Sequence, residues 1–189
     1  MELRKKLIVC FLTLSSFMSF CQESIENINE INLDNIAPNQ VHKYWLKLID
    51  NGFSQPISVP VIIAKGKYPG PVLGLLAAIH GNELNGIKVI QDVFKNINTE
   101  ELYGTVIAIP GLNHISITQD KRRFIDEEDL NRNFPGKEKG NRSQQYTWQI
   151  NQKILPKLDY LIDMHTASFG RINSLYVRAD MDNDKINCV

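Results

Sequence analysis

The sequence predicts an α/β fold in which a mostly parallel sheet is covered by helices on both faces. Three observations lead to this prediction. Short apolar segments bounded by Gly and Pro recur after residue 57, and segments with apolar residues at helical spacing alternate with them. The apolar segments are nearly continuous, which is typical of strands buried on both faces. Alternation of such strands with amphipathic helices is the pattern of α/β domains.

The elements are expected in a definite order along the chain. The packed part begins near Val41, and VHKYWLKLI (41–49) suits either a short helix or a strand. Gly and Pro punctuation with β-rich composition then predicts strands at residues 57–66, 69–81, 104–113, 159–165 and 173–180. Apolar residues at helical spacing predict helices at residues 84–97 and 142–158.

The pattern of the N-terminal residues predicts that the protein is exported. Residues 1–21 combine a basic start, MELRKK, with the apolar segment LIVCFLTLSSFMSFC, and small residues precede a possible cut at Gln22. This apolar segment is shorter than the roughly 20 residues that cross a bilayer. We therefore expect a signal peptide, a secreted or periplasmic protein, and no stable membrane span after cleavage. Residues 22–40 are polar and predict a linker or N-terminal arm.

Composition excludes some classes of partner and of scaffold. Lys and Arg number 21 and Asp and Glu also number 21, so no net field favours nucleic acid. Cys10 and Cys21 fall in the predicted signal peptide, which leaves Cys188 without an internal partner in the mature chain. The fold is therefore expected to rest on its apolar core.

Two histidines and a glutamate fall where predicted strands end. His80 and Glu83 follow the apolar run LLAAI, and His165 ends DYLIDMH. Molecules and ions that bind to open α/β sheets lie beyond the carboxyl ends of the strands. Three protein side chains that coordinate an ion, with a fourth position open, are typical of catalytic zinc. The alternative interpretation makes His80 a capping residue and Glu83 a first-turn acid that the dipole of the next helix stabilises. Only four His occur in the chain, and the position of two of them at strand ends favours the interpretation as a metal site.

A second group of polar residues lies in RRFIDEEDLNRNFPG (122–136), a loop by composition. Arg122, Arg123, Asn131 and Arg132 fall close together there. A guanidinium binds a carboxylate in bidentate fashion and can also stabilise an oxyanion beside a metal. The alternative is a solvated loop in which these arginines pair with the neighbouring acidic residues.

Taken in order, HGNE, DLNRNFPG and DMHTAS make the chain resemble the succinylglutamate desuccinylase and aspartoacylase family, deacylases with a zinc carboxypeptidase-like fold. The resemblance runs from about Val59 to Asp180. It implies that the His and Glu of the first motif and the His of the third, His80, Glu83 and His165, hold one zinc ion per chain.

The resemblance also implies roles for the second motif. Asn131 and Arg132 would bind a carboxylate of a small-molecule substrate, and Arg123 would polarise the scissile carbonyl, with Arg122 as the alternative. The implied reaction is hydrolysis of an amide bond in an N-acyl amino acid by zinc-activated water. Asp163, two residues before the third ligand, either orients that ligand or faces water at the strand end.

The sequence departs from the family pattern after the third motif. The general-base glutamate of the family follows the third ligand on a later strand, whereas residues 166–189 contain no Glu. We therefore expect residues 41–189 to be the N-terminal part of a catalytic domain that is incomplete at its C-terminus. The alternatives are a zinc carboxypeptidase acting on peptides or cell-wall fragments, and a non-catalytic relative that binds zinc and an anion.

Overall fold

A single mixed sheet organises residues 25–179, the part of the chain that the computed structural model describes. The predicted signal peptide at residues 1–21 lies outside this range. The elements in chain order are β1 (Glu26–Ile28), η2 (Leu33–Asn35), β2 (Gln40–Asp50), β3 (Pro56–Lys65), β4 (Tyr68–Ala77), α2 (Asn85–Asn96), β5 (Tyr103–Ile109), α3 (His114–Ile117), η3 (Leu130–Arg132), α4 (Arg142–Lys153), η4 (Leu155–Lys157) and β6 (Tyr160–Met164).

The sheet has the spatial order β1-β2-β3-β5-β4-β6. The pairs β1–β2, β5–β4 and β4–β6 are parallel, whereas β2–β3 and β3–β5 are antiparallel. The sheet is therefore mixed, because β2 and β3 are joined by a short hairpin connection that parallel strands cannot use. Ala77 at the end of β4 pairs with Met164 at the end of β6. The loops that follow these two strands thus leave the same edge of the sheet side by side.

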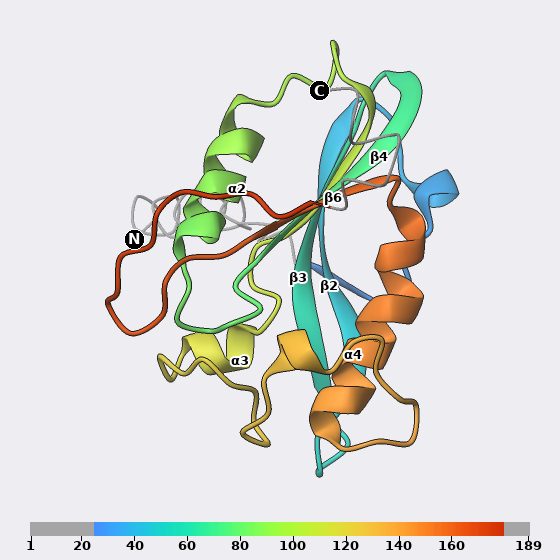
Figure 1. The fold of residues 1–189 in the computed structure, drawn as a ribbon. Helices are drawn as coiled ribbons and strands as arrows, with labels where there is room; N and C mark the ends of the chain where they lie inside the picture. Colours follow the sequence, from blue (N-terminus) through green and yellow to red (C-terminus); the bar gives the residue numbers. More distant parts are fainter. Residues whose placement is uncertain (1–24, 180–189) are drawn as a thin grey trace, which may run out of the picture.

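Two helices cover opposite faces of the sheet (Figure 1). The larger core lies on the α4 side, where Tyr146 and Ile150 are fully buried against the sheet. The smaller core lies on the α2 side, around Ile90. Gly86 in the first turn of α2 allows close approach, since a Cβ there would lie 2.8 Å from the Cβ atoms of Ala77 and Met164. This contact fixes the start of α2 directly beside the ends of β4 and β6.

The segment predicted as a linker is packed from residue 25 onward. Strand β1 pairs in parallel with β2, and Ile31 is fully buried in the core. The ammonium group of Lys65 donates hydrogen bonds of 2.7 and 2.8 Å to the carbonyls of Leu33 and Ile36. A few isoleucines suffice to attach this polar segment, although its average composition resembles that of a linker. The packed part of the structure therefore begins before Val41.

Strand pairing in the structure also decides what was expected of residues 41–49 and 173–180. Residues 41–49, open between helix and strand in the sequence, belong to β2. The strand expected at 173–180 is absent from the described residues, because 171–179 have no regular structure and the side chain of Leu175 is fully exposed. A β-rich run forms a strand only where a partner edge is available to it. Within residues 25–179, no helix is both long enough and apolar enough to cross a membrane.

Candidate metal centre

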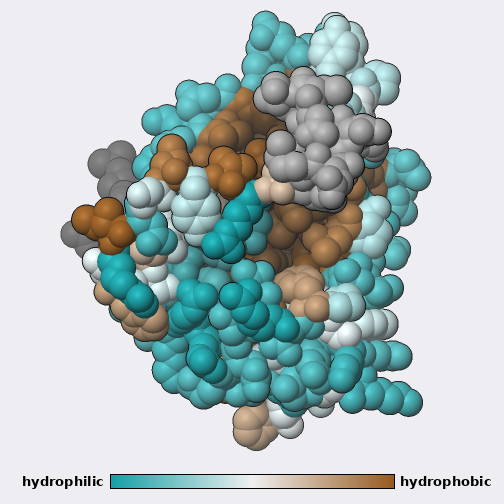
Figure 2. Space-filling model, viewed as in Figure 1, coloured by the Kyte–Doolittle hydropathy of each residue, from teal (hydrophilic) through white to brown (hydrophobic). Residues whose placement is uncertain are grey.

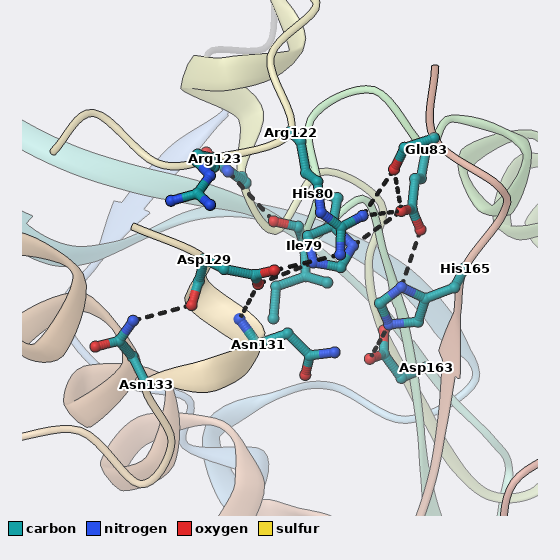
Figure 3. Close-up of polar contacts among 12 residues, drawn as sticks. Ile79, His80, Glu83, Arg122, Arg123, Asp129, Asn131, Asn133, Asp163 and His165 are labelled. Atoms are coloured by element: carbon teal, nitrogen blue, oxygen red, sulfur yellow. Dashed lines mark hydrogen bonds and ion pairs between the residues drawn. The ribbon is translucent and has the colours of Figure 1, made fainter. Parts of the chain in front are cut away.

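The loops after β4 and β6 bring the three predicted metal ligands together (Figure 3). One ligand atom from each of His80, Glu83 and His165 lies within 4.8 Å of the others. His80 and Glu83 are almost fully buried, with 2% and 3% of their surfaces exposed. They share a tight turn, in which the amide of Glu83 donates to the carbonyl of His80 over 3.1 Å. The sequence prediction that these residues converge is thus met by the geometry.

Each histidine of the cluster is held by a carboxylate on its outer nitrogen. Nε2 of His80 lies 3.0 Å from Oδ1 of Asp129, and Nε2 of His165 lies 2.8 Å from Oδ2 of Asp163. A carboxylate only accepts hydrogen bonds, so both Nε2 atoms carry the proton. In a neutral imidazole the lone pair then lies on Nδ1, which is the form that ligates a metal.

Both Nδ1 atoms face the carboxylate of Glu83. Nδ1 of His80 lies 3.0 Å from Oε1, and Nδ1 of His165 lies 3.0 Å from Oε2. The His80 contact has the distance but not the geometry of a hydrogen bond, and this buried nitrogen has no hydrogen-bond partner. A lone pair on nitrogen and a lone pair on oxygen repel at this separation unless a cation or a proton lies between them. The orphaned Nδ1 of His80 is therefore the observation that fits a bound metal ion.

The carboxylate of Glu83 is held in its ionised form. The hydroxyl of Ser168 donates to Oε1 over 2.6 Å, and the amide of Thr166 donates to Oε2 over 3.1 Å. Burial by itself raises the pKa of Glu83, but the hydrogen bonds from the Ser168 hydroxyl and the Thr166 amide contribute to lowering it to about 2. A permanently charged carboxylate among two imidazoles is a donor set that suits zinc.

The contacts with the outer carboxylates also shift the pKa values of His165 and Asp129. The hydrogen bond to Asp163 raises the pKa of His165 from its ordinary value, against the opposing effect of burial. Burial favours a higher pKa for Asp129, but its hydrogen bond with His80 and the charge of Arg122 lower it. Asp163 thus contacts His165 and does not face water alone.

The arginine that reaches the cluster is Arg122. Its guanidinium donates to Oε1 of Glu83 over 2.6 Å, to Oγ of Ser168 over 2.7 Å and to Oδ2 of Asp129 over 3.2 Å. Arg123, the residue favoured from the sequence, instead donates to the carbonyl of Glu127 over 2.6 Å and turns away from the cluster. Adjacent side chains in this loop point in opposite directions, and spacing in the sequence does not reveal which one points inward.

Two anchors hold the loop that carries Arg122 and Asp129. The buried hydroxyl of Ser116 donates to the carbonyl of Arg123 over 2.7 Å. The carboxylate of Asp126 accepts hydrogen bonds from the amide and hydroxyl of Ser143 at the start of α4. The loop is therefore tied to α3 on one side and α4 on the other.

Asn131 and Arg132, the predicted carboxylate-binding pair, lie in the turn η3 next to the cluster. The side chain of Asp129 accepts from the amide of Asn131 over 3.0 Å and so links this turn to His80. The Asn131 side chain lies on the same side of the cluster as Asp163 (Figure 3). Arg132 is exposed, and its guanidinium makes no hydrogen bond or ion pair within residues 25–179.

Sequence reasoning missed two members of this network. They are Asp129, one of the acidic neighbours of the loop arginines, and Ser168. Both belong to the motifs DLNR and DMHTAS, so their place in those motifs was the available signal. Their contacts with His80 and Glu83 depend on long-range packing that motif spacing alone does not give.

Comparison with known proteins is consistent with this geometry. Residues 69–188 match the sequence profile of the succinylglutamate desuccinylase/aspartoacylase catalytic domain. The chain belongs to this family. The matched range contains the cluster and the loop between residues 122 and 136.

Three relatives show the extent of the likeness. N-alpha-acetyl-L-2,4-diaminobutyric acid deacetylase of Halomonas elongata is 29% identical over 112 residues, covering 59% of this chain and 32% of that protein. The crystal structure of succinylglutamate desuccinylase/aspartoacylase from Rhodobacter sphaeroides superposes with a TM-score of 0.63 at 28% identity, covering 75% and 44%. An aspartoacylase family protein from Mesorhizobium loti gives 0.63 at 28% identity, covering 72% and 42%. The chain spans less than half the length of each of these relatives.

Proposed function

We propose that this family member takes part in zinc-dependent hydrolysis of the amide bond of an N-acyl amino acid. The observation that carries the proposal is the convergence of two Nδ1 atoms and one buried carboxylate, with each Nε2 held by a second carboxylate. The deacetylase from Halomonas elongata supports the reaction class, because its name describes removal of an acyl group from an amino acid.

His80, Glu83 and His165 would hold the zinc ion. When bound with an open coordination position, zinc polarises carbonyl groups and lowers the pKa of water to about 7. The residues of the chain determine the geometry around it. Asp129 and Asp163 fix the protons on the two Nε2 atoms and thereby keep both Nδ1 lone pairs directed at the same point.

The remaining polar groups suit the substrate. Arg122 lies against Glu83 and Asp129, so its guanidinium is placed to donate hydrogen bonds to a substrate carbonyl oxygen at the cluster. Arg132 is exposed and without an internal partner among the described residues, and with Asn131 it would hold a substrate carboxylate. These two groups together favour a substrate that carries an amide and a carboxylate a short distance apart.

The zinc site is tested by metal content. The protein, His80→Ala, His165→Ala and the control His42→Ala are loaded with zinc, desalted and measured by mass spectrometry of the metal. His42 lies on β2 and its ring nitrogen contacts only the Ala37 carbonyl, so that variant serves as a matched loss of imidazole. We expect about one zinc per chain in the protein and the control, and loss of zinc in the two cluster variants. Unchanged metal in both cluster variants would refute the site.

The reaction class is tested on the zinc-loaded protein with three substrates. These are an N-acetyl amino acid, an N-succinyl amino acid and a dipeptide with a free C-terminus. Release of free amine from the N-acyl amino acids supports a deacylase, whereas cleavage of the dipeptide alone would identify a carboxypeptidase.

A second candidate function is zinc and anion binding without turnover. Its motivation is that the cluster of His80, Glu83 and His165 and the exposed Arg132 would bind zinc and an anion whether or not turnover follows. If the protein purified from its source cells binds an N-acetyl amino acid and releases no amine, this candidate is favoured over the deacylase.

We also propose that the protein is exported, on the basis of the basic and apolar segments within residues 1–21. N-terminal sequencing of the native product tests this. A chain that begins near Gln22 supports export, and an intact N-terminus refutes it.

A further inference from the structure

A cavity of about 470 Å³ opens beside the candidate metal centre. Three features connect the two. Asp163, which holds His165, and Asn131, whose amide donates to Asp129, both line the cavity. Ile79, the residue directly before His80, lines it as well. A group bound in this cavity would therefore lie next to any substrate atom that reaches the metal ligands.

The walls of the cavity are apolar. They are contributed by β4, η4, β6 and the loops between elements, and consist mainly of Leu76, Ile79, Leu112, Phe134, Leu155 and Leu161. Figure 2 shows hydrophobic residues gathered near the centre of the face that is viewed there. An apolar cavity of a few hundred Å³ with a small number of polar groups at one end is the usual form of a small-molecule site.

The charges around the cavity disfavour an acidic occupant. None of the residues that line it is Lys or Arg, so a second carboxylate placed inside would lose its water without gaining a cationic partner. Asp163 at the rim adds a further negative charge in the direction of the metal ligands. The exposed Arg132 lies in η3 and does not line the cavity. In the proposed function its guanidinium binds one carboxylate of the substrate.

We propose that this cavity holds an uncharged hydrocarbon group of the substrate next to the scissile amide, an inference that rests on the deacylase function proposed above. The preferred substrates are then N-acyl amino acids with an aliphatic or aromatic group, and not those whose acyl group or side chain carries a second carboxylate. The hydrocarbon group is either the acyl chain or the amino-acid side chain, and both have the same chemistry at these walls.

Calorimetric titration of the zinc-loaded full chain tests the proposal with three probes. N-acetyl-L-leucine places the hydrocarbon on the side chain, N-hexanoylglycine places it on the acyl group, and N-acetyl-L-aspartate is the acidic reference. We expect one of the first two to bind at least about tenfold more tightly than the reference. Which one does so identifies the source of the group. Equal or tighter binding of N-acetyl-L-aspartate would overturn the proposal.

Two neighbouring residues of β6 provide a matched pair of variants. Leu161 lines the cavity and Ile162 does not, because successive side chains of a strand point to opposite faces. Their exposed fractions are similar, 46% and 51%, so both tolerate substitution comparably. We expect Leu161→Arg to remove the preference for the hydrocarbon probe and Ile162→Arg to keep it. Leu161→Trp, which fills the cavity without adding charge, should also weaken the hydrocarbon probe.

The remaining outcomes separate the two proposals. Preferential binding of a hydrocarbon probe without amide hydrolysis would leave the cavity assignment standing and overturn the deacylase function. Amide hydrolysis without preferential binding of a hydrocarbon probe would overturn the cavity assignment and leave the deacylase function standing. A large loss of thermal stability in Leu161→Arg with unchanged probe binding would show that protein fills the cavity, and would overturn its assignment to a substrate.

Discussion

Replacement of Asp129 by Asn should weaken zinc binding although the residue does not face the metal position. The carboxylate of Asp129 accepts three hydrogen bonds, from Nε2 of His80 over 3.0 Å, from the amide of Asn131 over 3.0 Å and from Arg122 over 3.2 Å. An amide of the same size has one acceptor oxygen and one donor nitrogen. At least one of these bonds is therefore lost, or the imidazole of His80 is driven toward the wrong tautomer.

The size of this effect follows from burial. Loss of an outer carboxylate that holds a metal-ligating His costs about 10-fold to 100-fold in metal affinity, or about 1.4 to 2.8 kcal/mol. The side chains of His80 and Asp129 are only 3% and 19% exposed, so solvent screens their contact little. We therefore expect the upper part of this range for Asp129→Asn. Asp129→Ala should cost more, because it leaves a buried Nε2 without any acceptor.

Competition with a chromophoric zinc chelator measures the change. Asp92→Asn is the matched control, since Asp92 is an exposed residue of α2 whose carboxylate pairs with Lys88. Circular dichroism and thermal unfolding establish that each variant is folded. A zinc affinity of folded Asp129→Asn equal to that of the control would refute the reasoning that Asp129 orients His80.

Three further predictions concern stability and are measured by denaturant unfolding. Gly86→Val should destabilise the fold by about 1 to 3 kcal/mol, because its Cβ would meet Ala77 and Met164 at 2.8 Å, whereas Gly52→Val, with open space around it, should change little. Tyr146→Phe should cost about 1 to 3 kcal/mol by leaving the buried carbonyl of Leu112 without its 2.7 Å hydrogen bond, and an unchanged stability would contradict that role. Burial lowers the pKa of His114 below its ordinary value of 6.5, so the stability that this residue contributes is complete above about pH 6.5 and falls as the pH drops toward the folded-state pKa. His114→Phe should therefore lose less stability than the parent between pH 7.5 and 5, and parallel losses would refute the assignment.

Much of the fold could be predicted because its signals are local. Gly, Pro and apolar periodicity located β3, β4, α2, β5, α4 and β6, since each of these elements carries its own apolar pattern between clear boundary residues. The segment before β2 could not be recognised, because the burial of Ile31 depends on a groove that distant strands create. The expected strand at 173–180 failed for the opposite reason, since its apolar residues find no partner among the described strands.

For the site, the sequence by itself determined which residue types meet. His80, Glu83 and His165 each follow a strand of a sheet in which parallel neighbours end at one edge, so their approach follows from topology. Only the tertiary structure decided which nitrogen of each His faces inward, that Arg122 and not Arg123 reaches Glu83, and that an apolar cavity lies beside this cluster. Side-chain direction in a loop and the space between packed elements arise from contacts between residues far apart in the chain, and no local pattern encodes them.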